Sequence, residues 1–403
     1  MYRVFIALAL ACSTLVSQGA PHSESNSKPL SAQPLLEIGP FSKEARDLEM
    51  VSPKSVLFHP DGSKFYVNAL EAGKTLVYDA HTYRKLATIR HEFDDHTALT
   101  PVSHGKFWGK PVEGWFTNGG RYLWVTYYRW SDDGGALKSS GLGLIDTTTD
   151  QLVRAYPTGN VPKFVTADAE DKTLAVTLWG ENRIELFDIR DPLRAVTLRT
   201  ITVGPAVKAV AGSDRDATCG MCLRGTVFIP GTTWLAVARM SSGGGLSIVD
   251  TQSARVLIDW PAMPATPRHL QVWGDWLYMT ANVSGQVARI SLTDLKAAVT
   301  SRKTPKVQAR KIGVGARTLK VTAQGVYVAL NESKEVAILP IDLSSVRYLD
   351  APAFPVGLDV SEGVLAVTSQ GRSGVGGHRL WLYDLAALGE PAKVVLAPDK
   401  RPR

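Results

Sequence analysis

The stretch Pro53-Lys54-Ser55-Val56-Leu57-Phe58-His59-Pro60-Asp61-Gly62, followed by Phe65-Tyr66-Val67-Asn68, decides the fold of this chain. It reads as a basic residue, a hydrophobic strand, a turn that contains glycine, and a second strand. The same pattern recurs seven times in all, with clear further copies that begin at Lys163, Arg268 and Arg317. A supersecondary unit that repeats in this way indicates a repeat architecture.

A second recurring signal is an apolar pair followed by aspartate at the end of a third strand. Aspartate in this position can accept hydrogen bonds from the backbone amides that follow, and it starts the turn into a fourth, outer strand. Apart from insertions the units are spaced by about 40 residues, which is typical of a four-stranded propeller blade. The clearest copies are Val77-Tyr78-Asp79, Leu144-Ile145-Asp146, Leu186-Phe187-Asp188, Ile248-Val249-Asp250 and Leu382-Tyr383-Asp384. We therefore predict an all-β fold, a seven-bladed β-propeller of four-stranded antiparallel blades.

The seven units make up one propeller domain, which we place at residues 35–403. A helical period is expected only at residues 292–299. Because a propeller must close its ring, either residues 35–38 or residues 394–396 supply the outer strand of the last blade. The blades are expected near residues 52–92, 110–159, 160–204, 222–262, 264–315, 316–354 and 355–398. Within the third blade we expect strands at residues 164–167, 173–178, 183–187 and 198–203.

The first twenty residues are predicted to be an export signal. Arg3 precedes a short apolar segment, residues 4–11, which is too short to cross a bilayer. Two processing sites compete: a lipobox-like sequence that ends at Cys12, which would then carry a lipid, and cleavage after Ala20. Residues 21–34 are rich in Ser, Pro and Asn and are expected to form a flexible linker. We therefore expect a periplasmic or extracellular protein, which contacts the membrane only if Cys12 carries a lipid.

Charge and cysteine content place further bounds on function. The chain has 45 Lys and Arg against 38 Asp and Glu, a net charge of +7, or +6 (44 − 38) once Arg3 is removed with the signal. This mild excess favours acidic partners. Cys219 and Cys222 are the two cysteines beyond the signal, and in an exported protein their close spacing predicts a local disulfide. A redox or metal role for this pair is the alternative interpretation.

The second strands of the units carry a resemblance to a known family. The chain resembles the YVTN-repeat, surface-layer-like seven-bladed β-propellers of exported bacterial and archaeal proteins. The resemblance implies binding or scaffolding at the cell envelope, with DNA as a ligand of some members, and it is nearly silent on activity. It rests on Phe65-Tyr66-Val67-Asn68, Leu123-Trp124-Val125-Thr126, Leu174-Ala175-Val176-Thr177, Leu277-Tyr278-Met279-Thr280, Val326-Tyr327-Val328-Ala329 and Leu365-Ala366-Val367-Thr368.

The basic residue at the start of each inner strand is expected to face the mouth of the central channel. Like charges gathered around a narrow mouth raise the free energy unless an anion or nearby carboxylates offset them. The pattern therefore predicts an anion-binding mouth for phosphate, carboxylate or a nucleic-acid backbone. Neutralisation by Glu71, Glu113, Glu181 and Glu332 is the alternative. The seven aligned positions are Lys54, Glu113, Lys163, Arg224, Arg268, Arg317 and Val356.

Other chemistry-bearing residues give weaker signals. Trp179 could stack on a ligand at the mouth, although capping a hydrophobic edge is the favoured interpretation. The histidines and carboxylates of residues 91–104 match no established metal-ligand spacing, so no metal or other cofactor is predicted. No nucleophile elbow, phosphate-binding loop or His-Glu-x-x-His motif is present in the sequence.

We therefore predict a monomeric, non-enzymatic envelope protein that binds an anionic ligand, either nucleic acid or glycan, or an envelope protein. Its predicted ligand-binding residues are Lys54, Lys163, Arg224, Arg268, Arg317, Glu113 and Trp179. One alternative is a propeller enzyme, a lactonase-like hydrolase or a redox-complex subunit, with its active site in the channel around Glu113, Glu181 or residues 91–104. Another is an assembly scaffold in which the channel is empty.

Overall fold

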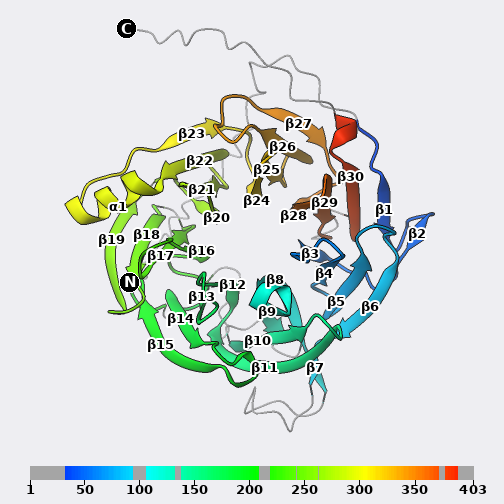
Figure 1. Cartoon of the computed structure of the whole chain (residues 1–403), viewed down its shortest axis with the longest axis horizontal. Coiled ribbons are helices and arrows are strands. Elements are labelled where there is room, and N and C mark those ends of the chain that lie inside the picture. Colours follow the sequence, from blue (N-terminus) through cyan, green and yellow to red (C-terminus); the bar gives the residue numbers. More distant parts are fainter. Residues whose placement is uncertain are drawn as a thin grey trace, which may run out of the picture.

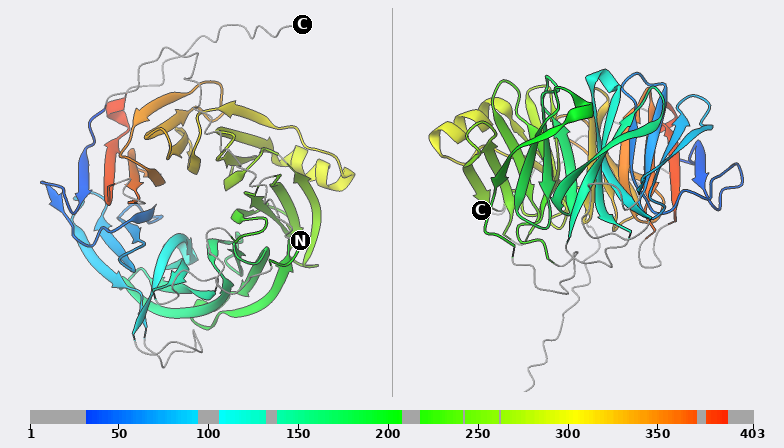
Figure 2. Two further views of the ribbon diagram at one scale, coloured as in Figure 1. Left: turned by 180° about the vertical axis from the view of Figure 1, so that it is seen from behind. Right: turned by 90° about the horizontal axis from the view of Figure 1, so that it is seen from below.

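The strands of the described chain form seven sheets around a central channel, which confirms the predicted seven-bladed β-propeller (Figure 1). This computed structural model describes residues 32–93, 106–131, 138–207, 218–241, 243–261, 263–371 and 377–388. Seen edge-on, the blades form a disc, and β2 and the α-helix project at its rim (Figure 2). Figure 1 shows the first strand of each blade beside the channel and the fourth strand at the rim.

Blades 1 to 4 follow one another along the chain. Blade 1 consists of β3 (Pro53–Phe58), β4 (Lys64–Ala69), β5 (Lys74–Asp79) and β6 (Lys85–Arg90). Blade 2 consists of β8 (Phe107–Thr117), β9 (Tyr122–Trp130), β10 (Ser139–Asp146) and β11 (Gln151–Asn160), with β7 (Glu92–Phe93) paired to β8. Blade 3 consists of β12 (Pro162–Ala167), β13 (Thr173–Leu178), β14 (Arg183–Asp188) and β15 (Val196–Thr202). Blade 4 consists of β16 (Leu223–Phe228), β17 (Trp234–Arg239), β18 (Gly245–Asp250) and β19 (Arg255–Pro261).

Blades 5 to 7 complete the ring. Blade 5 consists of β20 (Pro267–Trp273), β21 (Trp276–Ala281), β22 (Gln286–Ser291) and β23 (Gln308–Lys311). Blade 6 consists of β24 (Ala316–Thr322), β25 (Gly325–Leu330), β26 (Glu335–Leu339) and β27 (Arg347–Asp350). Blade 7 consists of β28 (Pro355–Ser361), β29 (Val364–Ser369), β30 (Arg379–Asp384) and β1 (Leu36–Gly39), with β2 (Ala45–Arg46) paired to β1. Three short 3-10 turns, η1 (Asn118–Gly120), η2 (Pro192–Arg194) and η3 (Ala386–Leu388), lie in the described connections.

The N-terminal strand closes the ring. β1 pairs antiparallel with β30 and places Leu36 opposite Leu382, so the first described strand becomes the outer strand of blade 7. Ile38 then joins a buried apolar cluster that holds side chains from blades 1 and 7. The competing segment, residues 394–396, lies outside the described residues.

The core is divided among the blade interfaces. Each pair of adjacent blades shares a cluster of buried apolar side chains, such as Val165 and Leu142 between blades 2 and 3. The alternation predicted from the sequence explains this, because side chains of one strand point to opposite faces of the blade and fill the two neighbouring interfaces. The channel is therefore lined by the ends and edges of the inner strands rather than by the apolar core.

An α-helix is inserted between the third and fourth strands of blade 5. α1 (Leu292–Ser301) begins at Ser291, whose hydroxyl accepts a hydrogen bond from the Asp294 amide at 3.0 Å. It ends at Arg302, which adopts a left-handed conformation, and so runs two residues beyond the predicted 292–299. Its buried residues, among them Leu295 and Val299, pack on blades 4 and 5. Within the described residues, no helix is long and apolar enough to cross a bilayer.

Candidate functional site

A repeated backbone conformation places one residue of each blade at the channel. In six of the seven described blades, the residue two positions before the channel-facing one has a positive φ, including the β-branched Val161 at 58° and Thr266 at 59°. Such residues rarely adopt this conformation, so the surrounding structure must hold it. The six residues are Ser52, Val161, Cys222, Thr266, Gly315 and Phe354.

One backbone hydrogen bond stabilises this conformation in all six blades. The carbonyl of the left-handed residue accepts from the amide that follows the second strand, as Val161 does from Trp179 at 3.0 Å and Thr266 does from Asn282 at 3.0 Å. The other pairs join Leu70 to Ser52, Met240 to Cys222, Asn331 to Gly315 and Gln370 to Phe354. Each channel-facing residue is thus anchored between two strands of its own blade.

A β-bulge then directs the next side chain into the channel. The ladder between the first two strands of each blade shifts register at this point, between Pro53 and Ser55 in blade 1 and between Pro267 and Leu270 in blade 5. A bulge leaves a residue outside the ladder and re-aims its side chain. The first bulge residue of each blade, directly after the last paired residue, is Lys54, Val112, Lys163, Arg224, Arg268, Arg317 or Val356.

Five of these positions are basic, as predicted, but the predicted position in blade 2 is wrong by one residue. Val112, not Glu113, is equivalent to Lys54 and Lys163, because it directly follows the last paired residue, Pro111, and lines the cavity. Glu113 instead lies beside His269, with 3.8 Å between a carboxylate oxygen and Nε2. His269 follows Arg268 on the bulge of blade 5, so these two groups approach each other from separate blades.

The five basic residues line one cavity of about 850 Å³ in the channel. We call Lys54, Lys163, Arg224, Arg268 and Arg317 the channel cations. Lys163, Arg268 and Arg317 are only 8%, 6% and 7% exposed, whereas Lys54 and Arg224 are half-buried. Val112 and Trp179 also line this cavity, which is open to solvent. The channel cations therefore face a space large enough for a small molecule.

Aromatic rings and a thioether pack against four of the channel cations. The Lys163 ammonium lies 3.2 Å from the centre of the Tyr128 ring, and the Arg224 guanidinium lies 4.0 Å from that of Trp179. Arg317 lies 5.6 Å from the ring of Phe354. Arg268 Nη1 lies 3.0 Å from the sulfur of Met240. Cation–π contacts stabilise a desolvated cation without cancelling its charge.

The electrostatics of the channel act most strongly on Lys54. Burial and the positive charges of Arg317, Arg268 and Arg224 hold the pKa of Lys54 well below its ordinary value, and Glu113 opposes them. Burial also lowers the pKa of His269. Burial would raise the pKa of Glu113, but His269, Lys54 and Arg268 outweigh it and lower that pKa. At neutral pH Glu113 is therefore negatively charged beside these cations.

Two of the carboxylates expected to neutralise the mouth are bound to other groups. Glu71 lines the cavity and forms ion pairs with Lys110 and, at 3.7 Å, with Arg129, which lines it too. Glu181 accepts from Arg183 at 2.9 Å and from the Asn160 amide at 2.5 Å. The third, Glu332, lines the cavity and accepts from Asn331 Nδ2 at 2.6 Å.

Trp179 links the channel to the cysteine pair. Cys219 and Cys222 form a disulfide that packs with Val161 and Trp179 in a small buried cluster, against Tyr128 and Met240. Trp179 therefore caps a hydrophobic edge, which is the interpretation favoured from the sequence. Its ring also presents one face to Arg224. Its indole Nε1 has no hydrogen-bond partner among the described residues. Cys12 lies outside the described residues.

Residues 91–104 were considered as a source of metal ligands, and the histidine that the structure describes there, His91, is buried. His91 contacts the hydroxyl groups of Thr75 at 2.8 Å and Tyr127 at 2.9 Å, and burial lowers its pKa to about 3. The other histidines of that segment, His96 and His104, lie outside the described residues. Across the described residues, no group of three or more His, Cys, Asp or Glu is placed to hold a metal ion.

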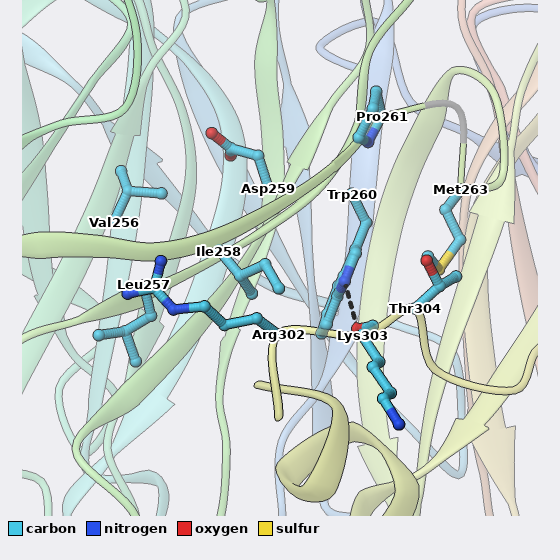
Figure 3. Close-up of a pocket in the computed structure, with 10 residues that line it drawn as sticks. All are labelled: Val256, Leu257, Ile258, Asp259, Trp260, Pro261, Met263, Arg302, Lys303 and Thr304. Atoms are coloured by element: carbon cyan, nitrogen blue, oxygen red, sulfur yellow. Dashed lines mark hydrogen bonds between the residues drawn. The ribbon is translucent and has the colours of Figure 1, made fainter. Parts of the chain in front are cut away.

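A second cavity of about 830 Å³ lies at the rim of the disc, between β19 and the chain that follows α1. We call it the outer groove. Trp260 on β19 donates from Nε1 to the Lys303 carbonyl at 3.0 Å, which ties the two walls together (Figure 3). Figure 3 shows Arg302 extended beside Leu257 and Ile258, and the ammonium of Lys303 directed away from Trp260. Sequence reasoning did not identify this cavity, because the walls are more than 40 residues apart in the chain.

Comparison with known proteins places the chain by its fold. No protein-family model matches it, and no curated protein matches its sequence. The β-propeller domain of Myceliophteria thermophila Cps50 (Swd1) superposes with a TM-score of 0.59 at 15% identity, over 83% of this chain and 97% of that chain. Kuenenia stuttgartiensis hydrazine synthase superposes with a TM-score of 0.56 at 14% identity, over 79% of this chain and 92% of that chain. A functionally unknown protein from Desulfotomaculum acetoxidans DSM 771 superposes with a TM-score of 0.53 at 10% identity, over 74% of this chain and 87% of that chain. Identities this low show the fold alone.

Proposed function

We propose that this protein binds an anionic ligand at the mouth of its channel and catalyses no reaction there. The observation that supports this most is the convergence of five basic residues, each from a different blade, on one cavity. Charge-assisted hydrogen bonds from Arg and Lys are the strong contacts that carboxylate and phosphate groups form with proteins. The left-handed residue and the bulge pre-organise these side chains, so little conformational entropy is lost on binding.

The electrostatic energy of the channel in the free protein also supports an anionic ligand. Burial and three positive groups, Arg317, Arg268 and Arg224, lower the pKa of Lys54, so the free protein holds unfavourable like-charge interactions in the cavity. A bound anion would attract each of these cations and so offset the repulsion between them. The free energy stored in the empty site would then contribute to the affinity.

We further propose that the protein acts as a monomer in the periplasm or outside the cell, as an exported member of the YVTN-repeat propellers. The N-terminal sequence supports export, through either a cleaved signal or a lipid on Cys12. The ligand classes that fit the charge are nucleic acid, anionic glycan, small anions and the acidic surface of an envelope protein.

A channel-centred enzyme is the second candidate, and one observation favours it. Glu113 and His269 lie 3.8 Å apart beside the channel cations, the arrangement of a general acid–base pair. A compound turned over by the protein, with turnover lost in Glu113→Gln, would replace the binding role by this one.

The test is binding of the purified protein to citrate, single-stranded DNA, a polyanionic glycan and a neutral glycan at about 50 and 200 mM salt. We expect salt-sensitive binding of at least one anion and none of the neutral glycan. A Lys163→Ala/Arg268→Ala double variant should lose most of this affinity and its salt dependence. Arg302→Ala/Lys303→Ala, in the outer groove, is the matched control with the same loss of charge. No anion binding, or equal binding by both double variants, would contradict the proposal.

A further inference from the structure

The burial of the channel cations bears on the size of the ligand. Lys163, Arg268 and Arg317 are each less than a tenth exposed, although they line a cavity of about 850 Å³. A polymer that lies across a protein surface contacts exposed cations, whereas these groups are largely buried and line the cavity. Cavities of about 300–1,000 Å³ are typical sites for small molecules.

The order of the channel cations around the ring bears on the charge of the ligand. Lys163, Arg224, Arg268 and Arg317 come from four consecutive blades and form a continuous basic arc. Lys54 comes from blade 1, whose first strand β3 lies across the channel from β16 and β20 (Figure 1). The equivalent residues of the blades on either side of Lys54 are Val112 and Val356. Arg129 of blade 2 also lines the cavity, where it pairs with Glu71 at 3.7 Å. A ligand that contacts cations of several blades at once fits best when it carries two or more anionic groups.

Two buried polar atoms bear on the remaining chemistry of the ligand. Trp179 and Asn331 both line the cavity, and neither Trp179 Nε1 nor Asn331 Oδ1 has a hydrogen-bond partner among the described residues. Buried polar groups in native proteins are normally satisfied by protein, water or ligand. The indole N–H can donate to a further anionic oxygen, whereas the amide oxygen needs a donor, which a hydroxyl group provides.

We propose that the channel takes a small, hydroxylated anion with at least two carboxylate or phosphate groups, bound between the basic arc and Lys54. This inference rests on the proposed anion-binding function and names the class of ligand. Hydroxypolycarboxylates and phosphorylated polyols belong to this class. Nucleic acid and glycan polymers do not, because their charged groups cannot reach the buried members of the arc.

Proton uptake would accompany binding. The anion would raise the pKa of Lys54, which burial and the neighbouring guanidinium groups lower in the free protein. Between the free and bound pKa values the complex holds one more proton than its components, so affinity decreases as pH rises through that window. Burial and the charges of Arg268 and Lys54 also lower the pKa of His269, so an anion that raises either pKa gives this signature, whereas a surface-bound anion would not.

The experiment is isothermal titration of the full chain with four probes: citrate, tricarballylate, acetate and a single-stranded DNA 20-mer. Tricarballylate is citrate without its hydroxyl group, and acetate carries a single charge. We expect citrate to bind about tenfold more tightly than tricarballylate and at least a hundredfold more tightly than acetate. The citrate heat should also depend on the ionisation enthalpy of the buffer. Inositol trisphosphate and pyrophosphate, titrated in parallel, separate phosphate from carboxylate ligands.

Variants locate the site without relying on one substitution. Arg317→Gln should weaken citrate binding about tenfold, and Lys54→Met should reduce the buffer-dependent heat. Arg302→Gln in the outer groove should change neither, and melting curves with and without citrate show which variants remain folded. Salt-sensitive DNA binding with no binding of any small anion would overturn this inference and leave the proposed function standing. Failure of every anion to bind would overturn both.

Discussion

The channel and the outer groove have nearly the same volume, about 850 and 830 Å³, yet they are built in different ways. One outer strand and the chain after α1 form the outer groove, and its two basic residues, Arg302 and Lys303, are adjacent in sequence. The channel receives one side chain from each of several blades, all positioned by the same bulge. The difference teaches that volume alone does not define a site in a propeller. The channel site is defined by a repeated backbone feature, which directs side chains of like charge to one point.

The largest effect that would separate the two cavities is reversal of charge. Arg268→Glu/Arg317→Glu places two carboxylates in the basic arc and should weaken citrate binding more than about a hundredfold, because each lost charged hydrogen bond costs roughly 1.5–3 kcal/mol. Isothermal titration measures the change. Arg302→Glu/Lys303→Glu makes the same change of charge in the outer groove and should leave affinity within about twofold. Equal losses in both variants would mean that net charge, not the channel, governs binding.

A smaller effect follows from extending the basic arc. Val112 occupies the equivalent position in blade 2, so Val112→Arg would join the arc to Lys54. We expect citrate affinity to rise about fivefold and the melting temperature of the free protein to fall, because a further cation increases the repulsion in the empty channel. Thermal melts with and without citrate measure both effects. A variant that melts lower and binds no more tightly would show that affinity does not follow the number of channel cations.

The pH dependence of stability also distinguishes Lys54 in the channel from Lys303 in the outer groove. Because the folded-state pKa of Lys54 is lowered, the unfolded chain binds more protons between that value and the ordinary pKa of about 10.4. Stability from this group therefore increases as pH rises through that interval. Lys54→Met removes the dependence and should raise the melting temperature near neutral pH by roughly 2 °C. Unfolding curves at several pH values test this, with Lys303→Met as the matched outer-groove control. Identical pH profiles for wild type and Lys54→Met would contradict it.

The smallest effect is expected from the two tryptophans. Trp179→Phe keeps an aromatic face for Arg224 and removes the indole N–H, so citrate affinity should fall about threefold. Trp260→Phe removes the hydrogen bond to the Lys303 carbonyl in the outer groove and should leave binding unchanged. Titration of both variants gives the comparison. An unchanged affinity in Trp179→Phe would exclude the indole N–H as a contact of the ligand.

The blades could be predicted because their signals are local. The alternation of apolar residues, the turn residues and the aspartate after the third strand all act within about 40 residues. In blade 3, the second strand runs from Thr173 to Leu178 as predicted. The outer strand begins two residues earlier and ends one residue earlier than predicted, at Val196 and Thr202, since outer strands carry fewer constraints from the core.

The candidate site could be predicted only in part. The basic residue at the start of the inner strand could be recognised in five blades. That Val112 rather than Glu113 occupies this position in blade 2 could not be recognised, because the alternation of apolar and polar residues does not reveal a bulge. The left-handed residues before Pro162 and Pro267 were equally hidden, since valine and threonine do not suggest a positive φ. His91 could not be assigned to the core because its partners, Thr75 and Tyr127, meet it only in the folded protein.

A crystal structure of the protein grown with citrate would test the central claim most directly. The account predicts citrate inside the channel, within hydrogen-bond distance of Arg268 and Arg317 and with one carboxylate toward Lys54, while the outer groove holds none. Citrate bound in the outer groove or elsewhere on the surface, with the channel unoccupied at a saturating concentration, would contradict it.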